Sequence, residues 1–278
     1  MVDLHTHSHA SDGDFSPTQL VDLAADAGIT ALALTDHDTI AGLTEATIQA
    51  QKHGIRFIPG VEIEVEFRPG EFHLLGLGLH LDETEELEKF LVEIRQRRQR
   101  RNTTMIERMQ ADGLTISQKS LEELAGGDVV GRMHMARWLI NAGKAKNVPE
   151  VFSQWLGPRC PYYVPRERPT LEEAIHAIHS AQGKAVLAHP LSLWISWGKM
   201  GERLAEWSKL GLDGVEARHS GASKREAARL EVLAEANGMF ITGGSDFHGP
   251  GRPDRRLGRG AAGKPGDLEL LEPFDEKN

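Results

Sequence analysis

VDLHTHSHASDG (residues 2–13) joins a short apolar run to a group of histidines and an aspartate near the start of the chain. Residues 2–5 have the pattern of a short buried strand, and His5 and His7 stand at its end. Because side chains at i and i+2 of an extended chain point to the same face, both imidazoles can reach one metal ion. Asp12 follows in a glycine-containing turn. Such histidine pairs also occur on surfaces and in cores, which are the alternatives to a metal site.

Strand and helix patterns alternate before residue 84 and again after residue 170. Apolar runs of strand length occupy residues 30–35, 55–59, 72–79, 184–188, 214–217 and 239–242. Helical patterns lie between them, and two begin with capping boxes, Ser16 to Gln19 and Thr170 to Glu173. This alternation predicts a mostly parallel sheet or barrel.

The middle of the chain has a different pattern. A long charged helix is expected over residues 84–111, followed by two or three shorter helices to about residue 156, without a clear strand. We therefore predict an α/β barrel domain made of residues 1–83 and 157–278, interrupted by a helical insertion domain of residues 84–156.

Histidine and acidic residues recur where the predicted strands end. The candidates are His5, His7, Asp12, His37, Glu62, His73, His189, Asp246 and His248. In barrels of parallel strands the catalytic side chains gather at the carboxyl ends of the strands, so these residues are expected to converge. Their mixture of imidazole and carboxylate suits Mn²⁺, Fe²⁺ or Zn²⁺ better than Mg²⁺ or Ca²⁺. The pattern therefore predicts a metal centre.

A known family has a similar succession of motifs. The chain contains, in order, HTHSHASDG, LTDHDT, PGVEI, the strand with His73, AHP and GSDFH. This order resembles that of PHP (polymerase and histidinol phosphatase) domains over about residues 1–82 and 157–250. The resemblance implies a distorted (β/α)7 barrel and up to three Mn²⁺ ions. It assigns one ion to His5, His7, Glu62 and Asp246, a second to Glu62, His73 and His189, and a third to Asp12, His37 and His248.

Two ions that share Glu62 would hold a bridging water, whose lowered pKa would supply the hydroxide that attacks phosphorus. Glu62, Asp246 and His189 are therefore the predicted catalytic residues, and no serine or cysteine nucleophile is required. Asp36 or Asp38, which flank His37, is expected to orient a ligand imidazole.

The insertion resembles that of one subgroup of the family. GRMHMAR (residues 131–137) resembles the subgroup's Arg-x-His-x-Ala-Arg helix, and Tyr163-Val164 resembles its Gly-Tyr-Val loop. This likeness implies a 3′,5′-nucleoside bisphosphate phosphatase that converts pAp to AMP, or a 5′→3′ exoribonuclease for short RNA. After His189 the chain has Leu191-Ser-Leu193, where the subgroup often has Gly-Arg-Tyr. A phosphatase for another phosphomonoester, such as histidinol phosphate, and a non-catalytic accessory module remain the alternatives.

Arginines crowd residues 95–101 of the predicted long helix. Guanidinium groups suit phosphate, so we expect the phosphate that is not cleaved to contact Arg95, Arg98, Arg132 and His134. His219, close to a predicted strand end, is expected to line the pocket. A solvated, salt-bridged helix face is the alternative for the arginines, since several glutamates precede them.

The composition limits the possible partners. A net charge of −9 argues against a general nucleic-acid coat protein and gives no sign of a DNA-binding module. No apolar run approaches the roughly 20 residues of a membrane span, and the first residues do not resemble a signal peptide. The single Cys160 fits a reducing compartment. We expect a cytoplasmic enzyme whose partner is a nucleotide or a short RNA, with no membrane association.

Overall fold

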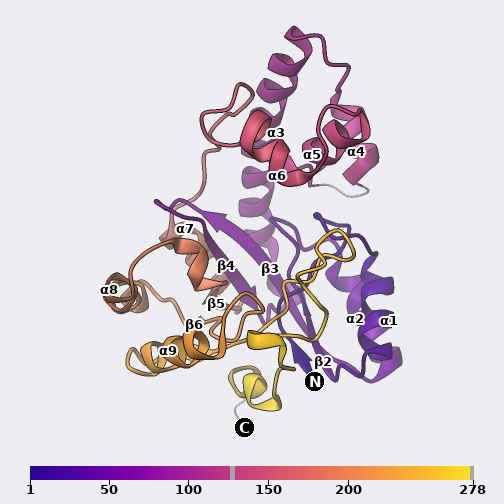
Figure 1. Ribbon diagram of the computed structural model, residues 1–278. Helices are drawn as coiled ribbons and strands as arrows, with labels where there is room; N and C mark the ends of the chain where they lie inside the picture. The colour runs from indigo at the N-terminus through magenta and orange to yellow at the C-terminus, as the bar shows by residue number, and fades with distance from the viewer. Residues whose placement is uncertain (126–128, 276–278) are drawn as a thin grey trace.

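The computed structural model describes residues 1–125 and 129–275, and its centre is a curled sheet of seven strands (Figure 1). The strands are β1 (Val2–Asp3), β2 (Ala31–Leu34), β3 (Arg56–Val65), β4 (Phe72–Leu77), β5 (Lys184–Leu187), β6 (Gly214–Val215) and β7 (Phe240–Ile241). They lie side by side in the order of the chain. Each predicted strand is present, although most are shorter than expected and β3 is longer.

One strand runs against the others. The pairings β1–β2 and β2–β3 are parallel, as are β5–β6 and β6–β7. Strand β4 is antiparallel to both of its neighbours, β3 and β5. The start of β4 therefore lies at the same edge of the sheet as the carboxyl ends of the parallel strands.

The two edge strands meet beyond their own ends. The N–H of Leu4 donates to the carbonyl of Gly243 at 3.1 Å, and the N–H of Asp246 donates to the carbonyl of His5 at 2.9 Å. Thr6 also forms an isolated parallel bridge with Phe247. These contacts draw the sheet toward a closed ring, and the expected distorted (β/α)7 barrel is confirmed.

Five helices surround the sheet. They are α1 (Pro17–Asp26), α2 (Leu43–His53), α7 (Leu171–Ser180), α8 (Trp197–Lys209) and α9 (Lys224–Glu235). The first two lie on one side in Figure 1, and the last three lie on the other. Both expected capping boxes form, since the side chains of Ser16 and Thr170 accept backbone N–H groups at the starts of α1 and α7. The apolar faces of these helices and the sheet share one large core.

The middle of the chain is helical within its described residues, and these helices gather at the upper end of the view in Figure 1. They are α3 (Glu85–Ala111), α4 (Gln118–Ala125), α5 (Arg132–Asn141), α6 (Val148–Val151) and the π-helical turn η2 (Phe152–Leu156). Helix α3 contributes Leu87 and Ile94 to the core of the barrel, whereas its Met105 and Met109 belong to a separate apolar cluster of the insertion. The division into domains at residues 84 and 156 stays a prediction.

Short 3-10 turns complete the fold. They are η1 (Leu81–Glu83), η3 (Pro190–Leu193), η4 (Ala261–Gly263) and η5 (Leu268–Phe274). Among the helices of the described residues, none is both long enough and apolar enough to cross a membrane.

Candidate metal centre

Glu62 lies at the middle of the candidate site. The strand that was expected to end at Pro59 continues as β3 to Val65, so Glu62 lies within it rather than after it. Val61 and Ile63 are fully buried in the core beside it, which holds this part of the strand in place. The carboxylate is itself only 1% exposed.

The two oxygens of Glu62 face different histidines. Its Oε1 lies 2.8 Å from Nδ1 of His73 and 3.1 Å from Nε2 of His189. Its Oε2 lies 3.4 Å from Nε2 of His5, 3.3 Å from Nε2 of His7 and 3.1 Å from Nδ1 of His37. This arrangement suits a carboxylate that is shared between two cations. His73 reaches the site because β4 is antiparallel and begins at this edge of the sheet.

Asp246 lies in the loop that follows β7 and faces the same two histidines as Glu62. Its Oδ1 lies 3.6 Å from Nε2 of His5 and 3.4 Å from Nε2 of His7. Donor atoms of His5, His7 and Asp246 all lie within 4.8 Å of one another, a spacing that one cation can bridge.

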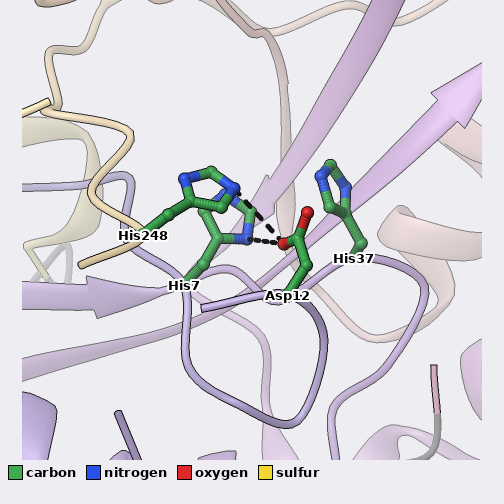
Figure 2. Close-up of side chains that lie close together, drawn as sticks. All are labelled: His7, Asp12, His37 and His248. Atoms are coloured by element: carbon green, nitrogen blue, oxygen red, sulfur yellow. Dashed lines mark ion pairs between the residues drawn. The ribbon is translucent and has the colours of Figure 1, made fainter. Parts of the chain in front are cut away.

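A further group of donors adjoins this one (Figure 2). His7, Asp12, His37 and His248 offer donor atoms that lie within 4.8 Å of one another. The Oδ1 of Asp12 is 3.3 Å from Nε2 of His248 and 3.9 Å from Nδ1 of His7. His7 thus turns one ring nitrogen to this group and the other to Glu62 and Asp246. The sequence predicted the members Asp12, His37 and His248 but not that His7 borders this group as well.

Several candidate ligand atoms in the centre form no hydrogen bond within the described residues. Among the described residues, Nε2 of His5, both ring nitrogens of His7 and Oε2 of Glu62 are buried without a hydrogen bond. Buried polar atoms of folded proteins are nearly always paired, so such a cluster of converging nitrogens and oxygens calls for a bound group. Imidazole and carboxylate donors in this number fit divalent transition-metal ions.

The charges of the site are strongly coupled. Burial alone would raise the carboxyl pKa values, yet the surrounding imidazoles hold the pKa of Asp12, Glu62 and Asp246 well below the usual range. Burial disfavours protonated histidine, but the carboxylates outweigh it and raise the pKa of His7 to about 10 and that of His73 to about 9. The carboxylates therefore stay ionised, and the site attracts positive charge.

Glu216, at the end of β6, supports the donors from behind, which the sequence did not indicate. Its Oε1 lies 3.0 Å from Nδ1 of His5, and its Oε2 accepts the backbone N–H of His189 at 2.7 Å. We expected Asp36 or Asp38 to orient an imidazole, and this was wrong. Asp36 accepts hydrogen bonds from Ser8 and Ser11, whereas Asp38 pairs with Arg98 and Arg166.

A cavity of about 530 Å³ opens over these donors. Arg98, Arg132 and His219, three of the expected substrate-binding residues, line it, and Arg101, Arg166, Arg168, Arg252 and Arg255 join them. Contact with phosphate stays a prediction. The structure does not bring Arg95 and His134 to this cavity. Arg95 donates to the carbonyl of Asp38 at 2.7 Å, and His134 is buried with its Nδ1 accepting the N–H of Gly131 at the start of α5.

Most of the guanidinium groups at the cavity are already paired with carboxylates. Arg98 pairs with Asp38, and Arg168 pairs with Glu64. Arg101 and Arg132 differ, because neither has a carboxylate partner among the described residues; Arg132 lies over the ring of Phe152. Arg101 is only 7% exposed, and burial together with neighbouring guanidinium groups holds its pKa well below its usual value. This part of the wall favours an anion.

Comparison with known proteins agrees with the geometry. Residues 3–158 match the PHP domain, and the chain belongs to the PHP family. It is a metal-dependent phosphoesterase, as the ligand motifs indicated.

Relatives cover nearly the whole chain. The chain is 35% identical over 252 residues to the 5′-3′ exoribonuclease Rnm of Escherichia coli, covering 90% of this chain and 86% of that protein. It is 33% identical over 258 residues to the 3′,5′-nucleoside bisphosphate phosphatase of Chromobacterium violaceum, covering 92% and 90%. A crystal structure from Bifidobacterium adolescentis, described as a metal-dependent phosphoesterase, has a TM-score of 0.84 at 30% identity and covers 97% of this chain and 95% of that one.

Proposed function

We propose that this enzyme removes the 3′-phosphate from nucleoside 3′,5′-bisphosphates, converting pAp to AMP, and degrades short RNA from its 5′ end. Two relatives that match about nine-tenths of the chain are named for these activities. The substrates share one chemical unit, a nucleoside with a 5′-phosphate and a phosphoester at the 3′ oxygen. An enzyme for both therefore has to hold one phosphate while it hydrolyses the other.

The observation that carries this proposal is that the buried Arg101 has no carboxylate partner in the part of the chain that the structure describes. It lies in the wall of the cavity that contains the metal-ligand candidates, together with Arg132. A buried guanidinium without a carboxylate is costly unless an anion joins it. The 5′-phosphate would supply that anion, accepting hydrogen bonds from both guanidinium groups. The 3′-phosphoester would then reach the metal ligands. Arg98 also lines this cavity, but its guanidinium already pairs with Asp38, so it is less available to a phosphate.

We propose three Mn²⁺ ions for the centre, with Fe²⁺ or Zn²⁺ as alternatives. His5, His7, Glu62 and Asp246 would hold one, His73 and His189 a second that shares Glu62, and Asp12, His37 and His248 a third. Bound there, the ions would acidify a water and neutralise phosphate oxygens. The protein holds the donors in place: Glu62 stands between two of the groups, and Glu216 fixes His5 and His189 from behind. We further propose that residues 1–83 and 157–278 form the catalytic barrel domain and that residues 84–156 form a separate insertion domain. We propose a cytoplasmic location for the enzyme.

A substrate panel assayed with Mn²⁺ tests the proposal. It contains pAp, a short RNA with a 5′-phosphate, the same RNA with a 5′-hydroxyl, histidinol phosphate and p-nitrophenyl phosphate. We expect kcat/KM for pAp and for the phosphorylated RNA to exceed that for the other three by about 100-fold, the effect of two charge-assisted hydrogen bonds. Asp246→Ala should abolish every activity. If histidinol phosphate or p-nitrophenyl phosphate is hydrolysed as well as pAp, the substrate is wrong, whereas the metal chemistry stands.

A further inference from the structure

Two aspartates connect the insertion helices to the barrel. The guanidinium of Arg137, on α5, lies 2.9 Å from Oδ1 of Asp14. Asp38 pairs with Arg98 of α3, and its backbone carbonyl accepts from Arg95 of the same helix. Asp38 is fully buried, so its pairing takes place away from solvent.

Both aspartates lie in loops that carry ligands of one proposed ion. Asp14 is two residues after Asp12, and Asp38 directly follows His37. Asp14 also holds the loop after His248: its backbone N–H donates to the carbonyl of His248 at 2.8 Å, and its Oδ2 accepts the N–H of Gly251 at 2.9 Å. Each of the three loops with Asp12, His37 and His248 therefore has a support from an arginine of the insertion, directly or through Asp14. This support adds to contacts within the barrel, such as the N–H of Asp38 donating to the carbonyl of Glu62 at 2.9 Å.

The other ligand candidates are held by the barrel. Glu62 lies in β3 and His73 in β4, within paired strands. The N–H of Asp246 donates to the carbonyl of His5, and Glu216 contacts both His5 and His189. His7 belongs with these, since its N–H donates to the carbonyl of Phe247 at 2.9 Å. The supports of this set come from the sheet and the loops next to it.

We propose that Arg137, through Asp14, is a positioning residue for the third ion, and that the insertion controls the affinity of this ion alone. The inference rests on the ligand groups of the proposed function. Arg137 does not line the cavity, so it acts on the ion through the loop of Asp12 and not through substrate. Supporting groups behind metal ligands change affinity by about 10- to 100-fold when they are removed.

Titration of the metal-free protein with Mn²⁺, followed by calorimetry and by metal analysis, tests this inference without substrate. The wild-type protein is expected to bind three ions. Arg137→Ala is expected to keep two with unchanged affinity and to bind the third about 10- to 100-fold more weakly. Asp14→Asn should weaken binding of the third ion at least as much, because Oδ2 of Asp14 also accepts the N–H of Gly251, and the double variant should be no worse than Asp14→Asn alone. Arg137→Lys should restore part of the affinity.

Arg56→Ala is the matched control, since Arg56 pairs with Asp275 at 2.6 Å at the start of β3, the edge opposite the site. It should leave all three affinities unchanged. The inference would be overturned if Arg137→Ala bound all three Mn²⁺ ions with wild-type affinity, or if it lost affinity equally for all three. Either result would leave the proposed function intact. A wild-type protein that binds fewer than three ions would contradict the ligand groups of the proposed function, and the inference with them. Circular dichroism confirms that each variant is folded.

Discussion

Nδ1 of His5 lies 3.0 Å from Oε1 of Glu216, while Nε2 on the other side of the same ring faces Glu62 at 3.4 Å. The buried imidazole is thus held between a supporting carboxylate and a ligand carboxylate. A supporting carboxylate fixes both the orientation of a ligand imidazole and the nitrogen that carries its proton. Since Glu216 also accepts the N–H of His189, it aligns two donors at once.

Glu216→Gln is expected to lower Mn²⁺ affinity and kcat by about 10- to 100-fold, because the amide keeps the shape of the side chain but loses its charge. Metal analysis after dialysis and steady-state kinetics measure the two effects. Glu231→Gln is the control, since Glu231 pairs with Arg218 and not with a ligand candidate. Full metal content and activity in Glu216→Gln would remove the supporting role.

Arg101→Met is expected to weaken substrate binding without lowering the stability of the ligand-free protein. Methionine retains the length of the side chain but cannot bind phosphate, so KM for pAp should rise about 10- to 100-fold with little change for p-nitrophenyl phosphate. The Tm of the ligand-free protein should stay the same or rise, because the change removes a buried charge that has no carboxylate partner among the residues with a described structure. Arg97→Ala, on the same helix and paired with Glu93, should change neither quantity. An equal loss on both substrates would speak against a phosphate role.

Metal binding is expected to release protons. In the metal-free protein, nearby carboxylates outweigh the effect of burial and raise the pKa of His7 to about 10 and that of His73 to about 9. Both are therefore protonated at pH 7 to 8, and an ion can bind only after the protons leave. The apparent Mn²⁺ affinity should rise with pH up to about 9 to 10. Calorimetry in HEPES and in Tris measures the released protons, and a binding heat that does not depend on the buffer would contradict this prediction.

The same two histidines contribute to the way the stability of the metal-free protein depends on pH. Their folded pKa values lie above the ordinary value of 6.5, so protonation favours the folded state. This contribution is complete below about pH 6.5 and is lost as the pH rises through 9 and then 10. Urea unfolding of the metal-free protein should show falling stability over this range. His7→Gln and His73→Gln should each flatten the profile.

Gly244→Ala is expected to destabilise the protein through a steric clash. A Cβ at this position would contact the Cβ of His5 and lie 2.7 Å from its backbone nitrogen and 3.0 Å from Oε1 of Glu216. Overpacking of this kind costs about 1 to 3 kcal/mol, which urea unfolding of the metal-free protein can measure. Gly198→Ala in α8 is the control, because no atom of the described residues lies within 4 Å of the added Cβ, apart from its chain neighbours and the backbone of its own helix. It should be neutral or stabilising by up to about 1 kcal/mol.

The sequence predicted much of the fold because its signals are local. Ser16 and Thr170 begin their helices as expected, and the charged helix forms over Glu85–Ala111. The direction of β4 was not predicted, because an apolar run does not indicate which way its strand runs. The extension of β3 past Pro59 was missed for a related reason, since its pairing with β4 comes from a distant part of the chain.

The residues of the candidate site also fall into those that the sequence could identify and those that it could not. The donors from His5 to His248 could be named because histidine and acidic residues at strand ends are rare enough to stand out. Glu216 could not, since a single glutamate after a short strand resembles any other. The arginines were harder still. Arg95 and Arg98 are three residues apart on one helix, yet only Arg98 lines the cavity, and Arg255 lies in a loop whose path no pattern predicted.

Helix α3 joins two apolar cores in one uninterrupted helix, with Leu87 and Ile94 in the first and Met105 and Met109 in the second. Each residue of an α-helix turns the chain by about 100° and advances it by about 1.5 Å. Loss or gain of one residue between Ile94 and Met105 would change the helical phase of everything beyond it. The two methionines would turn out of their core while Leu87 and Ile94 stayed in theirs. Substitutions here act on one side chain at a time, but a change of length would put the two cores out of register with each other.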